Sequence, residues 1–216
     1  LDYRKAEDKK FVLKASKTNI LDFSKSIIVD FERESKKRNI DFTLGTNNPG
    51  LEVYIDRNLM DKVYFNLLSN AFKFTPEKGK ISISIKEDKP NKTVKIYFKD
   101  SGIGIPVNEL KEVFNAFYQG SNNYRNSSGI GLHLSKSFIE LHRGRIEINS
   151  KNGAEFIITF PLGNEHLEEK EIINDAVLSD VHHSDYLDSD DIQSEIPKNT
   201  EGKYSILYIE DNRELL

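Results

Sequence analysis

A polar stripe runs along a segment that is otherwise apolar, residues 57–74. At about 100° per residue, a helix there would place five polar side chains on one line: Lys62, Asn66, Ser69, Asn70 and Lys73. Such a helix must be largely buried, and carboxamides that are buried without partners are costly. An amide oxygen on Mg²⁺ and a lysine facing phosphate groups would satisfy the stripe. Core asparagines that are hydrogen-bonded to the backbone are the alternative.

A second group of residues with chemical potential follows a predicted strand, at 100–106. Asp100 is followed by Gly102 and Gly104. Two glycines let the backbone approach a flat ligand closely, and a carboxylate can accept a hydrogen bond from an exocyclic amine. Asp-X-Gly-X-Gly is also the pattern of an ordinary turn, so this segment alone leaves both interpretations open.

Glycines also lead into a predicted helix at 127–132, where Gly129 and Gly131 precede the first helical turn. Unpaired N–H groups and the positive end of the helix dipole favour a phosphate group at such a place. Between the two glycine segments, residues 114–126 are polar and include Gly120. That composition suits a lid over a bound ligand.

The order of these patterns is more informative than any one of them. An Asn-X3-Asn helix, Asp-X-Gly-X-Gly, Phe-X2-Phe-Tyr-Gln and a glycine loop before a helix follow one another along the chain. This series resembles the N, G1, F and G2 boxes of sensor histidine kinases, in the superfamily shared with type II topoisomerases, Hsp90 and MutL. The resemblance covers about residues 1–162.

The resemblance implies ATP and Mg²⁺ as cofactors. The ATP-binding set that it implies is Asn66, Asn70, Lys73, Phe74, Asp100, Gly102, Gly104, Ile105, Tyr118, Ser128, Gly129, Gly131 and Leu132. By similarity, Asn70 supplies the amide that binds Mg²⁺ with Asn66 in support, and Lys73 contacts phosphate. Asp100 accepts from the adenine amino group, and Phe74 packs near the adenine. Residues 118–128 form the lid over the nucleotide.

The same resemblance carries a mechanistic expectation. Where the ATPase relatives have a glutamate that activates water, this chain has Asn66, which cannot act as a base. We therefore expect ATP to be held for transfer to a histidine on a dimerisation domain. None of the five histidines stands in a setting like the phospho-acceptor box, so no catalytic residue is expected in this chain.

Two departures from the family pattern keep other functions open. Ser127 replaces the first glycine of the G2 run, and Ala154 lacks the hydroxyl that is usual at its position. Both changes favour a nucleotide-independent signalling module with a decayed site. An ATPase that hydrolyses ATP is a further alternative, which Asn66 disfavours.

The elements that must position these residues give an α/β fold. One helix is expected after a cap at Asn19 or Asp22, with an apolar stripe from Ile20 to Phe31; others are expected at 57–74, near 109–114 and at 131–141. Strands are expected at 11–15, 40–44, 51–55, 80–86, 93–99, 144–149 and 155–160. We expect a two-layer α/β sandwich, and the resemblance implies that it is of the Bergerat type. Its mixed, largely antiparallel sheet has about five strands, with three helices on one face.

Charge divides the chain into unlike parts. Residues 165–201 hold twelve Asp and Glu but two Lys, whereas the whole chain has a formal charge of −4, so residues 1–164 are net basic. A basic body suits an anionic nucleotide or is simply a solvated lysine-rich surface. We expect the end of a dimerisation helix at 1–10, the catalytic domain at 11–163, an acidic linker with one helical turn near 167–173 at 164–202, and the truncated start of a receiver domain at 203–216.

Composition and layout set the expected partners and location. The chain has no cysteine, and no window approaches the roughly 18 consecutive apolar residues of a membrane helix. We therefore expect a cytoplasmic domain without a leader. Because the dimerisation helices are not part of this sequence, we expect it to be a monomer, and we expect it to bind no nucleic acid. The resemblance implies a homodimeric parent in the bacterial inner membrane, with its dimerisation domain and a fused receiver domain as partners.

Overall fold

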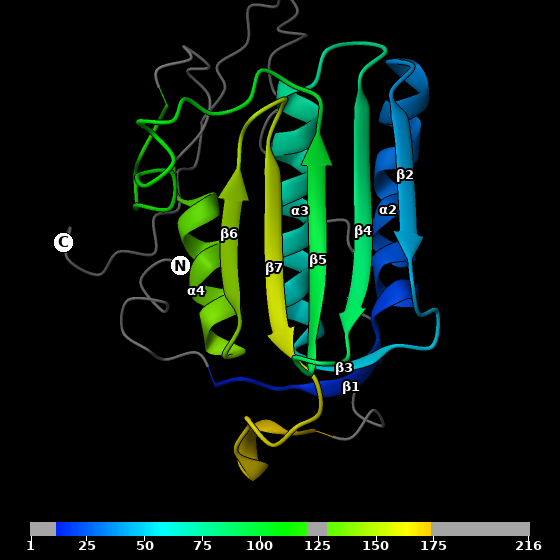
Figure 1. The fold of residues 1–216 in the computed structure, drawn as a ribbon, viewed down its shortest axis with the longest axis vertical. Helices are drawn as coiled ribbons and strands as arrows, with labels where there is room; N and C mark the ends of the chain where they lie inside the picture. Colours follow the sequence, from blue (N-terminus) through cyan, green and yellow to red (C-terminus); the bar gives the residue numbers. More distant parts are fainter. Residues whose placement is uncertain (1–11, 121–128, 174–216) are drawn as a thin grey trace, which may run out of the picture. The chain divides into compact units, whose positions relative to one another are not determined.

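Alternating apolar residues build one sheet whose inner face carries the core. The computed structural model describes residues 12–120 and 129–173. Five strands lie side by side (Figure 1), in the order β2 (Asp41–Thr46), β4 (Lys80–Asp88), β5 (Thr93–Asp100), β7 (Glu155–Pro161) and β6 (Arg145–Asn149). β2 runs parallel to β4, and the other neighbouring pairs are antiparallel. The mixed, largely antiparallel sheet that the sequence predicts is confirmed.

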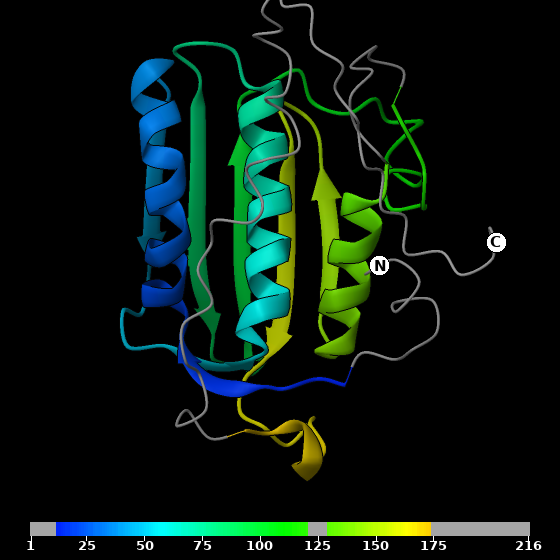
Figure 2. The same cartoon turned by 180° about the vertical axis from the view of Figure 1, so that it is seen from behind.

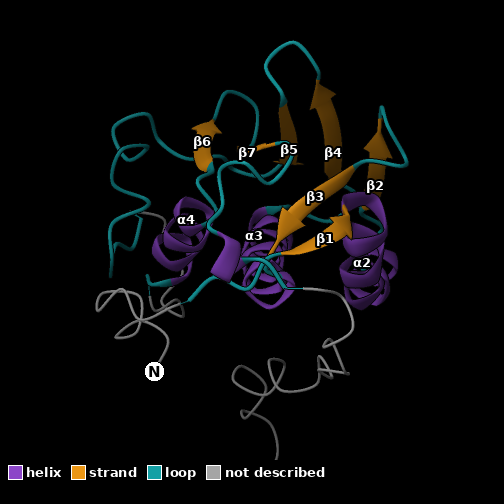
Figure 3. Ribbon diagram, turned by 90° about the horizontal axis from the view of Figure 1, so that it is seen from below, coloured by secondary structure: helices purple, strands orange, loops and turns teal. Residues whose placement is uncertain are grey.

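Three helices cover one face of this sheet: α2 (Ile20–Lys37), α3 (Arg57–Phe74) and α4 (Gly131–Leu141) (Figure 2). Seen from below, the helices form one layer and the five strands another (Figure 3). The predicted two-layer α/β sandwich is therefore confirmed, and α3 and α4 have their predicted bounds. Within the described part of the chain, none of the helices has the length and apolar content of a membrane span.

Aromatic packing fixes α3 against both α2 and the sheet. Tyr64 is fully buried, and its ring lies edge-on to Phe23 of α2 and Phe98 of β5, with centroid distances of 5.3 and 4.8 Å. The Tyr64 hydroxyl lies 3.0 Å from Ser24 Oγ. Burial raises the pKa of Tyr64, so the phenol stays neutral. This wide buried arc leaves the polar stripe of α3 for other contacts.

A short second sheet closes one end of the sandwich. β1 (Ser16–Asn19) pairs antiparallel with β3 (Glu52–Ile55). The strand predicted at 11–15, whose first residue lies outside the described residues, is therefore wrong in position, because Ala15 forms only an isolated bridge. Leu13 and Ala15 are buried in the core. Their apolar character reflects packing rather than strand pairing.

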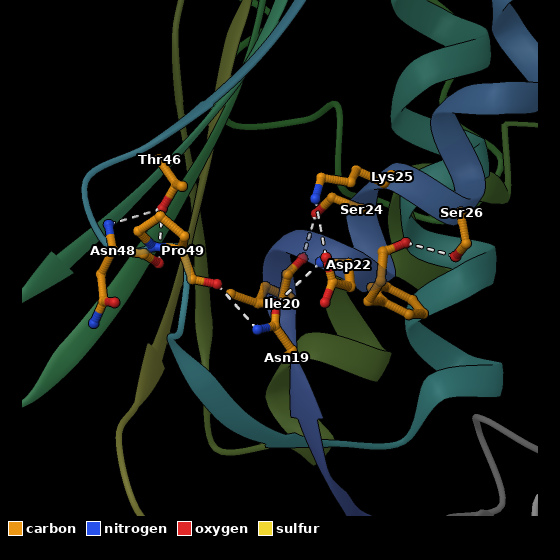
Figure 4. Close-up of polar contacts among 10 residues, drawn as sticks. Asn19, Ile20, Asp22, Ser24, Lys25, Ser26, Thr46, Asn48 and Pro49 are labelled. Atoms are coloured by element: carbon orange, nitrogen blue, oxygen red, sulfur yellow. Dashed lines mark hydrogen bonds and ion pairs between the residues drawn. The ribbon is translucent and has the colours of Figure 1, made fainter.

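The start of α2 is fixed by Asn19 rather than by Asp22. Asn19 Oδ1 accepts a hydrogen bond from Asp22 N–H at 3.0 Å, and Asn19 Nδ2 donates to Pro49 O at the same distance (Figure 4). In the turn that carries Pro49, Asn48 N–H donates to Thr46 Oγ1 at 3.1 Å. The cap thus ties α2 to the turn between β2 and β3.

The helix predicted near 109–114 is wrong. The segment forms successive turns, in which Glu109 N–H donates to Pro106 O at 2.8 Å and Glu112 N–H donates to Glu109 O at 2.9 Å. Helix nucleation is unfavourable in so short a segment. Burial of Glu109 and Val113 holds the turns in place instead.

Residues 162–173 turn back against the first strand. Ala15 N–H donates to Glu171 O at 2.7 Å, and Ile173 N–H donates to Ala15 O at 2.9 Å. Glu171 belongs to the short helix η1 (Glu169–Glu171), which lies where a helical turn was expected, and it pairs with Arg143 at 3.0 Å. The rest of the expected linker (174–202), the expected receiver start (203–216) and residues 1–11 lie outside the described residues.

Candidate functional site

The polar stripe of α3 stays partly accessible. Asn66, Asn70 and Lys73 are half-buried, whereas most of the apolar side chains of the helix are buried in the core. Lys73 Nζ lies 5.6 Å from the centre of the half-buried Phe74 ring. The predicted stripe is therefore present, and its asparagines are not fully buried core residues.

The first turns of α4 pack directly on this stripe. Asn66 Nδ2 donates a hydrogen bond to the buried Ser135 Oγ at 2.9 Å. A Cβ on Gly131 would stand only 2.2 Å from Asn66 Oδ1. Glycine is required there because α4 approaches the amide so closely. Asn66 and Ser135 are 69 residues apart in the sequence, so the asparagine helix and the helix that follows the second glycine segment meet in space.

The N-terminus of α4 lies beside Tyr118, the first residue of the predicted lid. Its cap residue Ile130 has an apolar side chain, which cannot accept from the first N–H groups of the helix. Gly129 has a φ of 67°, and a Cβ there would stand 2.7 Å from Tyr118 O. Partial desolvation, and then a hydrogen bond with Glu109, raise the pKa of Tyr118. Half-buried Leu132 follows in the first turn, and Ser128 lies outside the described residues.

Asp100 ends β5 with a carboxylate that is only 6% exposed. Its Oδ1 accepts from Gly102 N–H at 2.8 Å and from Ala154 N–H at 3.2 Å. Burial raises the pKa of this carboxyl, and the two N–H groups oppose that effect. Both hydrogen bonds fall on Oδ1, so Oδ2 is the oxygen from which a ligand can be recognised. The Ala154 contact uses the backbone and needs no hydroxyl at that position.

Close backbone contacts hold the loop after β5 against α3 and against the β6–β7 turn. A Cβ on Gly102 would stand 2.4 Å from Phe74 O, so this glycine lets the loop reach the end of α3. Gly104 has a φ of 68°, a conformation that favours glycine. Ile105 N–H donates to Ser150 Oγ at 2.6 Å. Sequence reasoning missed Ser150, which no local pattern marks.

His142 joins the other end of α4 to the start of α3. Its Nε2 accepts from Asp56 N–H at 2.9 Å, and its Nδ1 donates to Phe138 O at 2.6 Å. These two bonds fit the neutral ring with its proton on Nδ1. Burial lowers the pKa of His142. Because Asp56 caps α3, this histidine and Ser135 hold α4 to α3 at two separate places.

A separate surface hollow of about 780 Å³ lies at the turn between β4 and β5. Its lining residues are Asn47, Asn48, Lys86, Glu87, Asp88, Lys89, Pro90, Lys95 and Tyr97. Lys95 pairs with Asp88 at 3.8 Å, and Lys86 Nζ lies 5.1 Å from the centre of the Tyr97 ring. None of the predicted site residues lines this hollow, so it is not the candidate site.

Comparison with known proteins identifies the family of the chain. Residues 55–164 match the family described as "Histidine kinase-, DNA gyrase B-, and HSP90-like ATPase". "Histidine kinase P4" of Formosa agariphila is 36% identical in an alignment 231 residues long, gaps included, which covers 100% of this chain and 17% of that protein. "Hybrid signal transduction histidine kinase D" of Dictyostelium discoideum is 33% identical over 197 residues, or 86% of this chain and 13% of that protein. The chain thus spans less than a fifth of either relative.

Solved structures show the same relationship. The catalytic domain of histidine kinase ThkA, in a nucleotide-free form, has a TM-score of 0.63 and 30% identity, and the match covers 69% of this chain and 97% of that one. ThkA in complex with the response regulator protein TrrA matches with a TM-score of 0.61, over 71% of this chain and 43% of that one. The chain therefore belongs to the histidine kinase-, DNA gyrase B- and HSP90-like ATPase family, as the ATP-binding catalytic domain of a histidine kinase.

Proposed function

We propose that this domain binds ATP with Mg²⁺ among α3, α4 and the loop after β5, and that the whole protein transfers the γ-phosphoryl group to a histidine. One observation carries the proposal. The polar stripe of α3 meets the glycine-led start of α4 at Asn66 and Gly131, and the end of α3 meets the Asp100 loop at Gly102. Two of the predicted motifs therefore meet the helix that carries the third.

The Asp100 side of the site suits the adenine. Oδ2 of Asp100 accepts from the exocyclic amino group, which guanine lacks at that position, while Oδ1 is held by two backbone N–H groups. Gly102 and Gly104 let the backbone approach the ring, with Ile105 and Phe74 as its apolar neighbours.

The α4 side of the site suits the phosphates. The backbone N–H groups at Gly129, Gly131 and Leu132, together with the helix dipole, stabilise negative charge at this end of α4, where the cap residue offers no side-chain acceptor. Lys73 contacts phosphate from the stripe of α3, and Tyr118 and Ser128 bound the lid. Asn70, with Asn66 in support, offers amide oxygens of the kind that Mg²⁺ accepts. When bound, Mg²⁺ neutralises charge on the phosphate oxygens.

Asn66 decides between transfer and hydrolysis. Its carboxamide donates to Ser135 and cannot take a proton from water. The domain therefore positions the γ-phosphoryl group and leaves the acceptor to another domain. The acceptor that we propose is a histidine on a dimerisation domain, and we propose a receiver domain as the next recipient.

The relatives support this wider arrangement. A hybrid kinase is among them, and ThkA has been solved with a response regulator. We propose that the parent protein is a homodimer anchored in the bacterial inner membrane, with this domain on the cytoplasmic side.

Phosphoryl transfer tests the proposal. Radiolabelled ATP and Mg²⁺ are added to this chain together with a histidine-bearing dimerisation domain, with an Asn70→Ala variant as the control. Acid-labile label on the dimerisation domain, little free phosphate and no label with the variant are expected. Rapid phosphate release without labelled histidine would show an ATPase instead. If neither product forms, the function is independent of nucleotide turnover.

A further inference from the structure

The Asn66 carboxamide lies along one face of α4. Nδ2 donates to Ser135 Oγ at 2.9 Å, and a Cβ on Gly131 would stand 2.2 Å from Oδ1 and 2.9 Å from Cγ. Gly131 and Ser135 are four residues apart and therefore share a helix face. The flat amide thus contacts the bare Cα of Gly131 at one end and a hydroxyl at the other.

This contact gives the carboxamide a direction. An asparagine side chain has an oxygen that accepts and a nitrogen that donates, and the two ends can exchange by rotation. Donation from Nδ2 to Ser135 turns Oδ1 toward Gly131, at the N-terminal end of α4. An oxygen rather than an NH₂ group then faces the end of the helix where the phosphates are expected. Mg²⁺ takes oxygen ligands, directly or through water.

We propose that Ser135 is a positioning residue that orients the Asn66 amide, so that Oδ1 serves the Mg²⁺–phosphate end of the nucleotide. This inference rests on the proposed function of the site. Ser135 is 2% exposed, so water does not readily replace its hydroxyl. Without that hydroxyl, Nδ2 of Asn66 loses the acceptor that holds the amide in this orientation.

The chain offers a matched control on the same helix. Ser137 Oγ donates to His133 O at 3.0 Å, a bond that stays within α4. Ser137→Ala therefore removes a hydroxyl from α4 without touching Asn66. Ser135→Cys serves as a second variant. The thiol has nearly the same volume as the serine hydroxyl group but is a weaker hydrogen-bond acceptor, whereas Ser135→Ala removes the acceptor entirely.

The test is the ratio of the ADP dissociation constants without and with Mg²⁺. We expect Ser135→Ala to lower this ratio about fivefold, the effect of losing one ordinary buried hydrogen bond, and to leave the Mg²⁺-free constant within about twofold. Ser135→Cys should lie between, and Ser137→Ala should match the wild type. In the protein without nucleotide, the side-chain NH₂ resonances of Asn66 should move in Ser135→Ala and not in Ser137→Ala.

One outcome would overturn the inference alone, namely an unchanged ratio in Ser135→Ala. If both affinities fall equally, the ratio is unchanged in the same way, and Ser135 is then merely structural. Failure of the proposed function looks different, because the wild-type protein itself then binds no nucleotide. That result would overturn the inference as well.

Discussion

Replacing Asp100 by asparagine tests the adenine side of the site. Oδ1 of Asp100 accepts backbone N–H groups at 2.8 and 3.2 Å, and an asparagine oxygen can take over both bonds. The NH₂ group of the asparagine then stands where Oδ2 stands now. A donor at that place faces the adenine amino group, which is also a donor. The substitution thus removes recognition while it retains the contacts that hold the loop.

The expected magnitude follows from the lost bond. A hydrogen bond to a charged group contributes about 1.5–3 kcal/mol, so the dissociation constant of ADP should rise about 10- to 150-fold. The folded state should be little affected, because burial already raises the pKa of Asp100 and a neutral amide avoids that cost. Calorimetric titration gives the affinity, and thermal unfolding gives the stability.

Asp88→Asn is the matched control, since Asp88 lies at the opposite end of the β4–β5 pairing, in the surface hollow. Its ADP affinity should equal that of the wild type. If Asp100→Asn is folded and binds ADP within about threefold of the wild type, Asp100 is not the adenine acceptor and the reasoning is wrong.

Three further changes probe the contacts of α4. Gly131→Ala places a methyl group 2.2 Å from Asn66 Oδ1, an overpacking worth about 1–3 kcal/mol; titration should show weaker ATP-analogue binding, and unchanged binding would contradict the close contact. Burial lowers the pKa of His142 below its ordinary value, so below about pH 6.5 the unfolded chain takes up a proton that the native state does not. In urea unfolding, the free energy of unfolding should therefore be retained above that pH and fall as the pH falls, and it should fall less steeply in His142→Gln. If the wild type and the variant lose stability with equal slopes, His142 is not the source of the pH dependence. Glu171→Gln removes the ion pair with Arg143 and should lower the free energy of unfolding by about 1 kcal/mol, as measured by thermal unfolding. Nucleotide affinity should not change, and a change would show that Glu171 has a role in the site.

Periodicity and helix boundaries made the central helices predictable. The polar stripe at Asn66 and Asn70 required an apolar helix around it, and Pro76 set where that helix had to end. The Asp100 loop was predictable for a similar reason, because two glycines at fixed spacing permit a close backbone approach. The fold class followed from the order of these elements.

Contacts between distant residues were not predictable from local pattern. Asn66 and Ser135 are 69 residues apart, and the His142 bond spans 86 residues. The apolar run before β1 looked like a strand because burial and strand pairing select the same residue types. The segment at 109–114 looked helical because its apolar spacing fits a helix, although it is too short to sustain one.

Nucleotide binding itself is the most direct test of the central claim. Calorimetric titration of this chain with ADP and an ATP analogue, each with and without Mg²⁺, is compared with an Asn70→Ala variant. The account predicts Mg²⁺-dependent binding in the micromolar to millimolar range, about 4–8 kcal/mol, that is weakened in the variant. A folded wild-type protein that binds neither nucleotide would contradict it.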